Sequence, residues 1–78
     1  PMIALKALIA TALNVPVASV LDTTTMEETP AWDSLAHMDV ILSIEKHYDI
    51  NLEGDDIADM LSVAAIAGIL KQKGVSFV

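Results

Sequence analysis

The chain has no cysteine in 78 residues, and this absence restricts how so short a sequence can fold. Domains of this size lie near the lower limit for folding without disulfides, metals or partner chains. Neither a disulfide framework nor a thiolate metal site is possible here. Stability must therefore come from an apolar core, and 54% of the residues are hydrophobic, with few aromatics. We expect one domain of packed helices over residues 1–78.

Apolar residues recur at helical spacing over residues 3–14. The stripe that would face the core consists of Leu5, Leu8, Ile9, Ala12 and Leu13. Lys6 lies inside this apolar run rather than before it, which argues against a signal peptide. Asn14 and Pro16 interrupt any membrane-spanning stretch, and Pro16 disfavours helix in the preceding residue. We expect an amphipathic core helix, no membrane segment and a cytoplasmic protein.

A second helix is expected over residues 34–48, after a long connection over residues 15–32. Its expected core face consists of Met38, Ile41, Ile44 and Tyr48. Leu35 and Leu42 share a different face with Asp39, which indicates either a contact surface or packing beneath the connection. Loops of this length are uncommon in compact domains and are often functional. The apolar residues expected to pin the loop to the helices are Val17, Val20, Leu21 and Met26.

Turn and capping residues predict two further helices. Gly54 breaks the pattern, and Asp55 or Asp56 is expected to cap a short third helix. Ser62 is expected to cap a fourth helix, which Gly74 ends. The inward residues of this last helix are Val63, Ile66, Ile69 and Leu70. The predicted fold is all-α, a mostly antiparallel four-helix bundle with a long first loop, and we expect a monomer.

The charge is strongly negative, with eleven acidic residues against four lysines and a formal net charge of −7. This balance argues against nucleic acid, because phosphate binding needs clustered cations. It also argues against anionic membrane surfaces. We expect partners with basic patches, whose association weakens as salt rises. The same charge also serves solubility.

Asp33 and Ser34 stand directly before the second apolar run. The first backbone N–H groups of a helix lack intrahelical acceptors, so an anion there is stabilised by those donors and by the helix dipole. With Asp33 as N-cap, Ser34 would be the first helical residue and its hydroxyl would be free. The alternative is that Ser34 itself is the N-cap and that Asp33 lies outside the helix.

The order of these features resembles that of the acyl carrier proteins. A first helix and a long loop precede Asp33-Ser34-Leu35 at the start of a second helix, in a short acidic chain. The later pair of adjacent aspartates and the Ser-Val start of the last helix also match. In that family the serine of the Asp-Ser-Leu motif carries a 4′-phosphopantetheine arm. The resemblance implies that Ser34 is attached to this arm, taken from coenzyme A, and that the arm holds acyl or aminoacyl groups as thioesters.

The resemblance also implies partners. A phosphopantetheinyl transferase would recognise Asp33, a ligase or acyltransferase would load the arm, and downstream biosynthetic enzymes with basic patches would use the cargo. The residues expected to face these enzymes are Leu35, Met38, Asp39, Leu42 and Glu45. Residues that would line a cavity for an acyl chain, or simply pack in the core, are Leu13, Ile41, Ile44, Met60, Leu61 and Ile66.

The sequence departs from the family pattern in two places. Trp32 stands where many carriers have glycine, and its indole is expected to pack over the loop. Ala36, His37 and Lys46 make the second helix less acidic than is usual in the family. We therefore expect a dedicated carrier of one lipid, polyketide or other specialised pathway, rather than the carrier of general fatty-acid synthesis.

Two other classes of function compete with this interpretation. An unmodified acidic adaptor would bind a basic or amphipathic helix through the face of Leu35 and Leu42. A calcium loop beginning at Asp49 would need glutamate where Met60 stands, so a specific site is not expected.

A catalytic role is also not expected. Ser34, His37 and Asp39 have the residue types of a hydrolytic triad, but Asp39 follows His37 too closely to face it on a helix. His37 and His47 lie too far apart around the helix to share a metal, and we expect both to face solvent. The sequence therefore predicts neither an enzyme nor a metal site.

Overall fold

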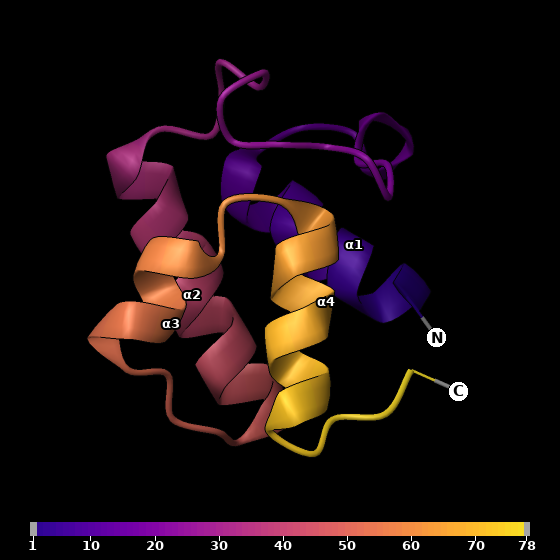
Figure 1. Ribbon diagram of the computed structural model, residues 1–78. Helices are drawn as coiled ribbons and strands as arrows, with labels where there is room; N and C mark the ends of the chain where they lie inside the picture. The colour runs from indigo at the N-terminus through magenta and orange to yellow at the C-terminus, as the bar shows by residue number, and fades with distance from the viewer. Residues whose placement is uncertain (1, 78) are drawn as a thin grey trace.

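The computed structural model describes residues 2–77, and the described chain is all-α (Figure 1). Its elements are α1 (Met2–Leu13), the short 3-10 helix η1 (Val17–Ser19), α2 (Ser34–Tyr48), α3 (Gly54–Asp59) and α4 (Val63–Gln72). The predicted helices are thus present, and α2 has the predicted bounds. No helix among residues 2–77 combines the length and the apolarity that a membrane span requires.

The helices pack around one core, with the loop between α1 and α2 running along one end of them (Figure 1). Figure 1 shows that α2 and α4 both begin at that end, whereas α1 ends there. The bundle is therefore only partly antiparallel, because the short α3 returns the chain to the loop end before α4 starts. The largest fully buried side chains are Trp32, Leu5, Ile9, Ile41, Ile44, Met60, Ile66 and Leu70. Burying each aliphatic side chain stabilises the fold by about 1.5–3 kcal/mol.

The three longer helices end in the same way. Asn14, Asp49 and Gly74 each have positive φ, at 57°, 53° and 93°. In each case the next backbone N–H donates to a carbonyl five residues earlier, as from Val15 to Ala10 at 3.0 Å. This is the Schellman motif, which satisfies helix carbonyls that lack intrahelical partners. The first helix therefore ends at a left-handed asparagine, and Pro16 follows it.

The long loop is tied to the start of α4 by backbone hydrogen bonds. The N–H of Met26 donates to the carbonyl of Leu61 at 2.9 Å, and that of Val63 donates to Thr24 at 3.0 Å. Of the apolar loop residues expected to pin it, Val20 is buried and Met26 is half-buried. The other two, Val17 and Leu21, are exposed, so this part of the prediction was wrong.

Caps define the two C-terminal helices. Ser62 Oγ accepts from the N–H of Ala65 at 3.0 Å, which confirms the predicted cap of α4. The predicted cap of α3 was wrong, because Glu53 and not Asp55 or Asp56 holds that position. Glu53 and Asp56 form a reciprocal capping box, in which each side chain accepts from the other residue's backbone N–H.

Candidate functional site

The start of α2 places Ser34 on the surface in the first helical turn. Asp33 is the N-cap, and its Oδ1 accepts from the N–H of Ala36 at 2.8 Å. The N–H of His37 donates to the carbonyl of Asp33, also at 2.8 Å, and closes the first turn. The alternative in which Ser34 is the N-cap is therefore wrong. Ser34 is exposed, and its hydroxyl makes no hydrogen bond within the described part of the chain.

The surroundings of Ser34 suit a negatively charged group. The backbone N–H groups of Ser34 and Leu35 have no acceptor among residues 2–77, as expected at a helix N-terminus. The first turn of α2 contains no acidic residue, although the N-cap Asp33 precedes it. A phosphate on Ser34 would thus lie near two open donors and the positive end of a 15-residue helix.

Trp32 and His37 form a buried pair directly beneath this turn. The Trp32 indole Nε1–H donates to His37 Nδ1 at 3.0 Å, and the ring centroids are 6.0 Å apart. On its other side, His37 Nε2 lies 3.0 Å from the carbonyl oxygen of Ile57 in α3. His37 is only 7% exposed, so the prediction that it faces solvent was wrong, whereas His47 is exposed as expected.

The burial of His37 shows that the core-facing stripe of α2 differs from the predicted one. The buried side chains of the helix are His37, Val40, Ile41 and Ile44, with the spacing of one helical face. Met38 lies outside this stripe with 46% of its surface exposed, so its placement on the core face was wrong. The apolar residues alone indicate a different phase, because the buried position 37 is occupied by a polar histidine.

These contacts leave no hydrolytic or metal site at the start of α2. Both ring nitrogens of His37 are engaged by Trp32 and Ile57, and neither is bonded to Ser34. Among residues 2–77, no group of three or more histidine or acidic side chains is placed to hold a metal ion.

One exposed apolar surface continues from Ser34 along α2. It consists of Leu35, Met38 and Leu42, and we call it the apolar α2 face. Leu35 is 82% exposed and Leu42 is 59% exposed, so the alternative that they pack beneath the loop was wrong. Asp39 is exposed between them.

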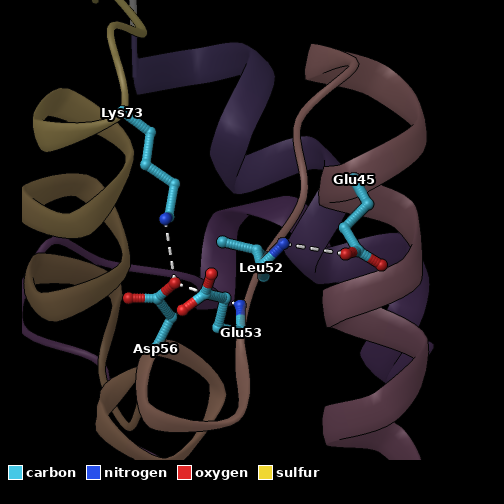
Figure 2. Close-up of polar contacts among 5 residues, drawn as sticks. All are labelled: Glu45, Leu52, Glu53, Asp56 and Lys73. Carbon is cyan, nitrogen blue, oxygen red and sulfur yellow. Dashed lines mark hydrogen bonds and ion pairs between the residues drawn. The ribbon is translucent and has the colours of Figure 1, made fainter.

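Glu45, expected to face partners, also makes a contact inside the domain. Its Oε2 accepts from the N–H of Leu52 at 2.9 Å and holds the segment that leads into α3 (Figure 2). Nearby, the Nζ of Lys73 lies 2.9 Å from Asp56 Oδ2 and joins α4 to α3. The hydrogen bond from Lys73, followed by that from the Glu53 backbone, lowers the pKa of Asp56. These acids therefore stabilise the arrangement of α2, α3 and α4.

The residues considered for an acyl cavity are mostly core residues. Leu13, Ile41, Ile44, Met60 and Ile66 are buried, whereas Leu61 is 49% exposed. None of them lines the surface depression of about 430 Å³ on α1 and α2, which is formed by Leu8, Ser43, Lys46 and His47.

Comparison with known proteins identifies the family. The phosphopantetheine attachment site family matches residues 4–70. Among solved structures, the holo acyl carrier protein from Geobacter metallireducens, determined by NMR in solution, superposes with a TM-score of 0.78. The two chains are 27% identical, over 90% of this chain and 80% of that one. A comparison with curated proteins finds no match. The chain belongs to the phosphopantetheine-binding carrier proteins, and it is a carrier rather than an enzyme.

Proposed function

We propose that Ser34 bears the 4′-phosphopantetheine arm and that the chain holds acyl or aminoacyl groups as thioesters on the thiol of this arm. The observation that carries the proposal is the free, exposed Ser34 hydroxyl in the first turn of α2, beside two backbone N–H groups without acceptors. The hydroxyl would attack the phosphoanhydride of coenzyme A, forming the phosphodiester and releasing adenosine 3′,5′-bisphosphate. The cofactor supplies the thiol, which the chain lacks.

Asp33 has two roles in this proposal. Its Oδ1 caps α2 and fixes Ser34 at the first helical position. Its carboxylate is also exposed beside the serine, where a phosphopantetheinyl transferase would recognise it. Because asparagine also caps helices well, Asp33→Asn separates the cap from the charge.

The apolar α2 face is proposed as the docking surface for partner enzymes. Its three side chains remain exposed next to Ser34, and Asp39 supplies a negative charge among them. The partners proposed are the transferase, a loading ligase or acyltransferase, and downstream enzymes that offer an apolar pocket and a cation. Glu45 contributes indirectly, since its carboxylate is bonded to Leu52.

The kind of pathway that the carrier serves is proposed from the same surface. With Asp39 as the exposed acid of the apolar α2 face, this face differs from the strongly acidic partner helix that general fatty-acid synthesis would favour. We therefore propose a monomeric, single-domain cytoplasmic carrier over residues 1–78, dedicated to one lipid, polyketide or other specialised pathway.

Intact mass spectrometry tests the attachment. The protein is incubated with coenzyme A, Mg²⁺ and a broad-specificity phosphopantetheinyl transferase, beside Ser34→Ala and a matched control, Ser43→Ala, in the same helix. We expect one phosphopantetheine on the parent protein and on the control, and none on Ser34→Ala. Modification of Ser34→Ala would overturn the assignment of Ser34.

An unmodified adaptor remains the second candidate, because the exposed leucines of the apolar α2 face would bind an amphipathic helix without any arm. Absence of modification by several transferases, with partner binding that survives in Ser34→Ala, would favour it. A carrier would lose all function in that variant.

A further inference from the structure

Two segments beside the start of α2 meet at the imidazole of His37. The indole of Trp32, in the segment before the helix, donates to Nδ1 at 3.0 Å. The carbonyl of Ile57, in α3, lies 3.0 Å from Nε2. The His37 backbone N–H donates to the Asp33 carbonyl across the turn that holds Ser34. One buried residue thus contacts both sides of the turn and the short helix beside it.

The two hydrogen-bond partners of the imidazole decide which tautomer His37 adopts. An indole N–H only donates, so His37 Nδ1 must accept and therefore carries no proton. In the neutral ring the proton then lies on Nε2, which donates to the Ile57 carbonyl. We propose that His37 is a positioning residue, which Trp32 holds in the Nε2–H tautomer so that it fastens α3 to the start of α2 beside Ser34.

Helix α3 depends on this bond because it has few other polar attachments. It contains six residues and is too short to be stable alone. The Ile57 carbonyl belongs to its last turn and receives only a long contact of 3.4 Å from the N–H of Met60. Among residues 2–77, the bond from His37 is the hydrogen bond that joins α3 to α2, and the Lys73–Asp56 pair joins α3 to α4. The imidazole therefore caps the end of α3.

The charged groups near Trp32, His37 and Ile57 lie on α3 and at the start of α2. Helix α3 brings Asp55, Asp56 and Asp59, and the start of α2 brings Asp33 and Asp39. None of these carboxylates lies within ion-pair distance of His37, and Asp56 pairs with Lys73. Hydrogen bonds, rather than an ion pair, hold the imidazole.

Two substitutions separate the two bonds of the ring. The amide of glutamine reaches about as far as Nε2, so His37→Gln keeps a donor for Ile57 and loses the acceptor for Trp32. The amide of asparagine ends near the position of Nδ1, so His37→Asn keeps the acceptor and loses the donor. A residue that only filled space would give the same result in both variants.

The experiment is NMR on the unmodified protein at neutral pH. We expect ¹⁵N shifts of the Nε2–H tautomer for His37 in the parent protein, with the exposed His47 as reference in the same spectrum. Hydrogen exchange at the Ile57 and Met60 amides should accelerate roughly three- to tenfold in His37→Asn, the factor for one hydrogen bond, and much less in His37→Gln. Exchange of the Trp32 indole proton should show the opposite order.

Observing the Nδ1–H tautomer, or equal exchange in both variants, would overturn the proposal. If both variants unfold, Trp32→Phe with His37 intact replaces them. It removes the donor to Nδ1 and should protect α3 less, and unchanged exchange at the Ile57 and Met60 amides would contradict the proposal. The same variants should also affect modification, because the KM of the transferase should rise more in His37→Asn than in His37→Gln. Only this expectation rests on the proposed function. The NMR result stands whether or not Ser34 is modified, so the two proposals fail separately.

Discussion

Replacing Asp33 by alanine removes the N-cap of α2 and should weaken both the fold and the modification of Ser34. The substitution leaves the Ala36 N–H without the acceptor that now lies at 2.8 Å. Loss of an aspartate cap costs about 1 kcal/mol, within a range of roughly 0.5–2 kcal/mol. In a domain of this size, 1 kcal/mol lowers Tm by about 4–8 °C.

Ser62→Ala is the matched control, because it removes the equivalent cap of α4, a 3.0 Å bond to the Ala65 N–H. Both variants should lose similar stability in urea unfolding, but only Asp33→Ala should also slow modification by coenzyme A and transferase. Asp33→Asn should keep the stability and lose the part of the rate that depends on charge. Equal modification rates in Asp33→Ala and Ser62→Ala would refute the role given to Asp33.

Three further predictions concern stability. Ile44→Ala, at a fully buried position, should lower the free energy of unfolding by about 2–5 kcal/mol in urea titration. Asp49→Gly should raise the free energy of unfolding by roughly 0.5–1 kcal/mol, because Asp49 has φ of 53° and glycine relieves left-handed strain. A large decrease in the free energy of unfolding would contradict the Schellman assignment. Because Lys73 lowers the pKa of Asp56, the stability from this pair is complete above the ordinary value of 3.8 and is lost as pH falls through the lowered pKa. As pH falls below 3.8, the free energy of unfolding should therefore decrease less in Lys73→Met than in the parent protein. Parallel curves of unfolding free energy against pH would refute the pairing.

The sequence was most informative where local chemistry determines structure. The bounds of α2 follow from an Asp-Ser pair before a periodic apolar run, and the cap of α4 follows from Ser62 in the same way. The cap of α3 was harder to predict from the sequence, because three nearby residues are all acidic and only the path of the backbone selects among them. These residues are Glu53, Asp55 and Asp56.

The largest errors concern contacts that depend on tertiary structure. His37 is buried because Trp32 folds beneath α2 and α3 supplies a carbonyl 20 residues away, which periodicity cannot show. Counting His37 as a core position would have given the correct stripe and would have moved Met38 to the surface. The bond from the Leu52 N–H to Glu45 could not be predicted for a similar reason, since it depends on the path of the chain after α2.

The position of the modification in the chain decides whether Ser34 is the attachment site. After incubation with coenzyme A, Mg²⁺ and a phosphopantetheinyl transferase, the protein is digested and its peptides are fragmented in a mass spectrometer. We expect phosphopantetheine on Ser34 alone, within the peptide that contains Trp32 and His37. Phosphopantetheine on another hydroxyl, or an unmodified Ser34 with transferases that modify other carriers of this family, would contradict it.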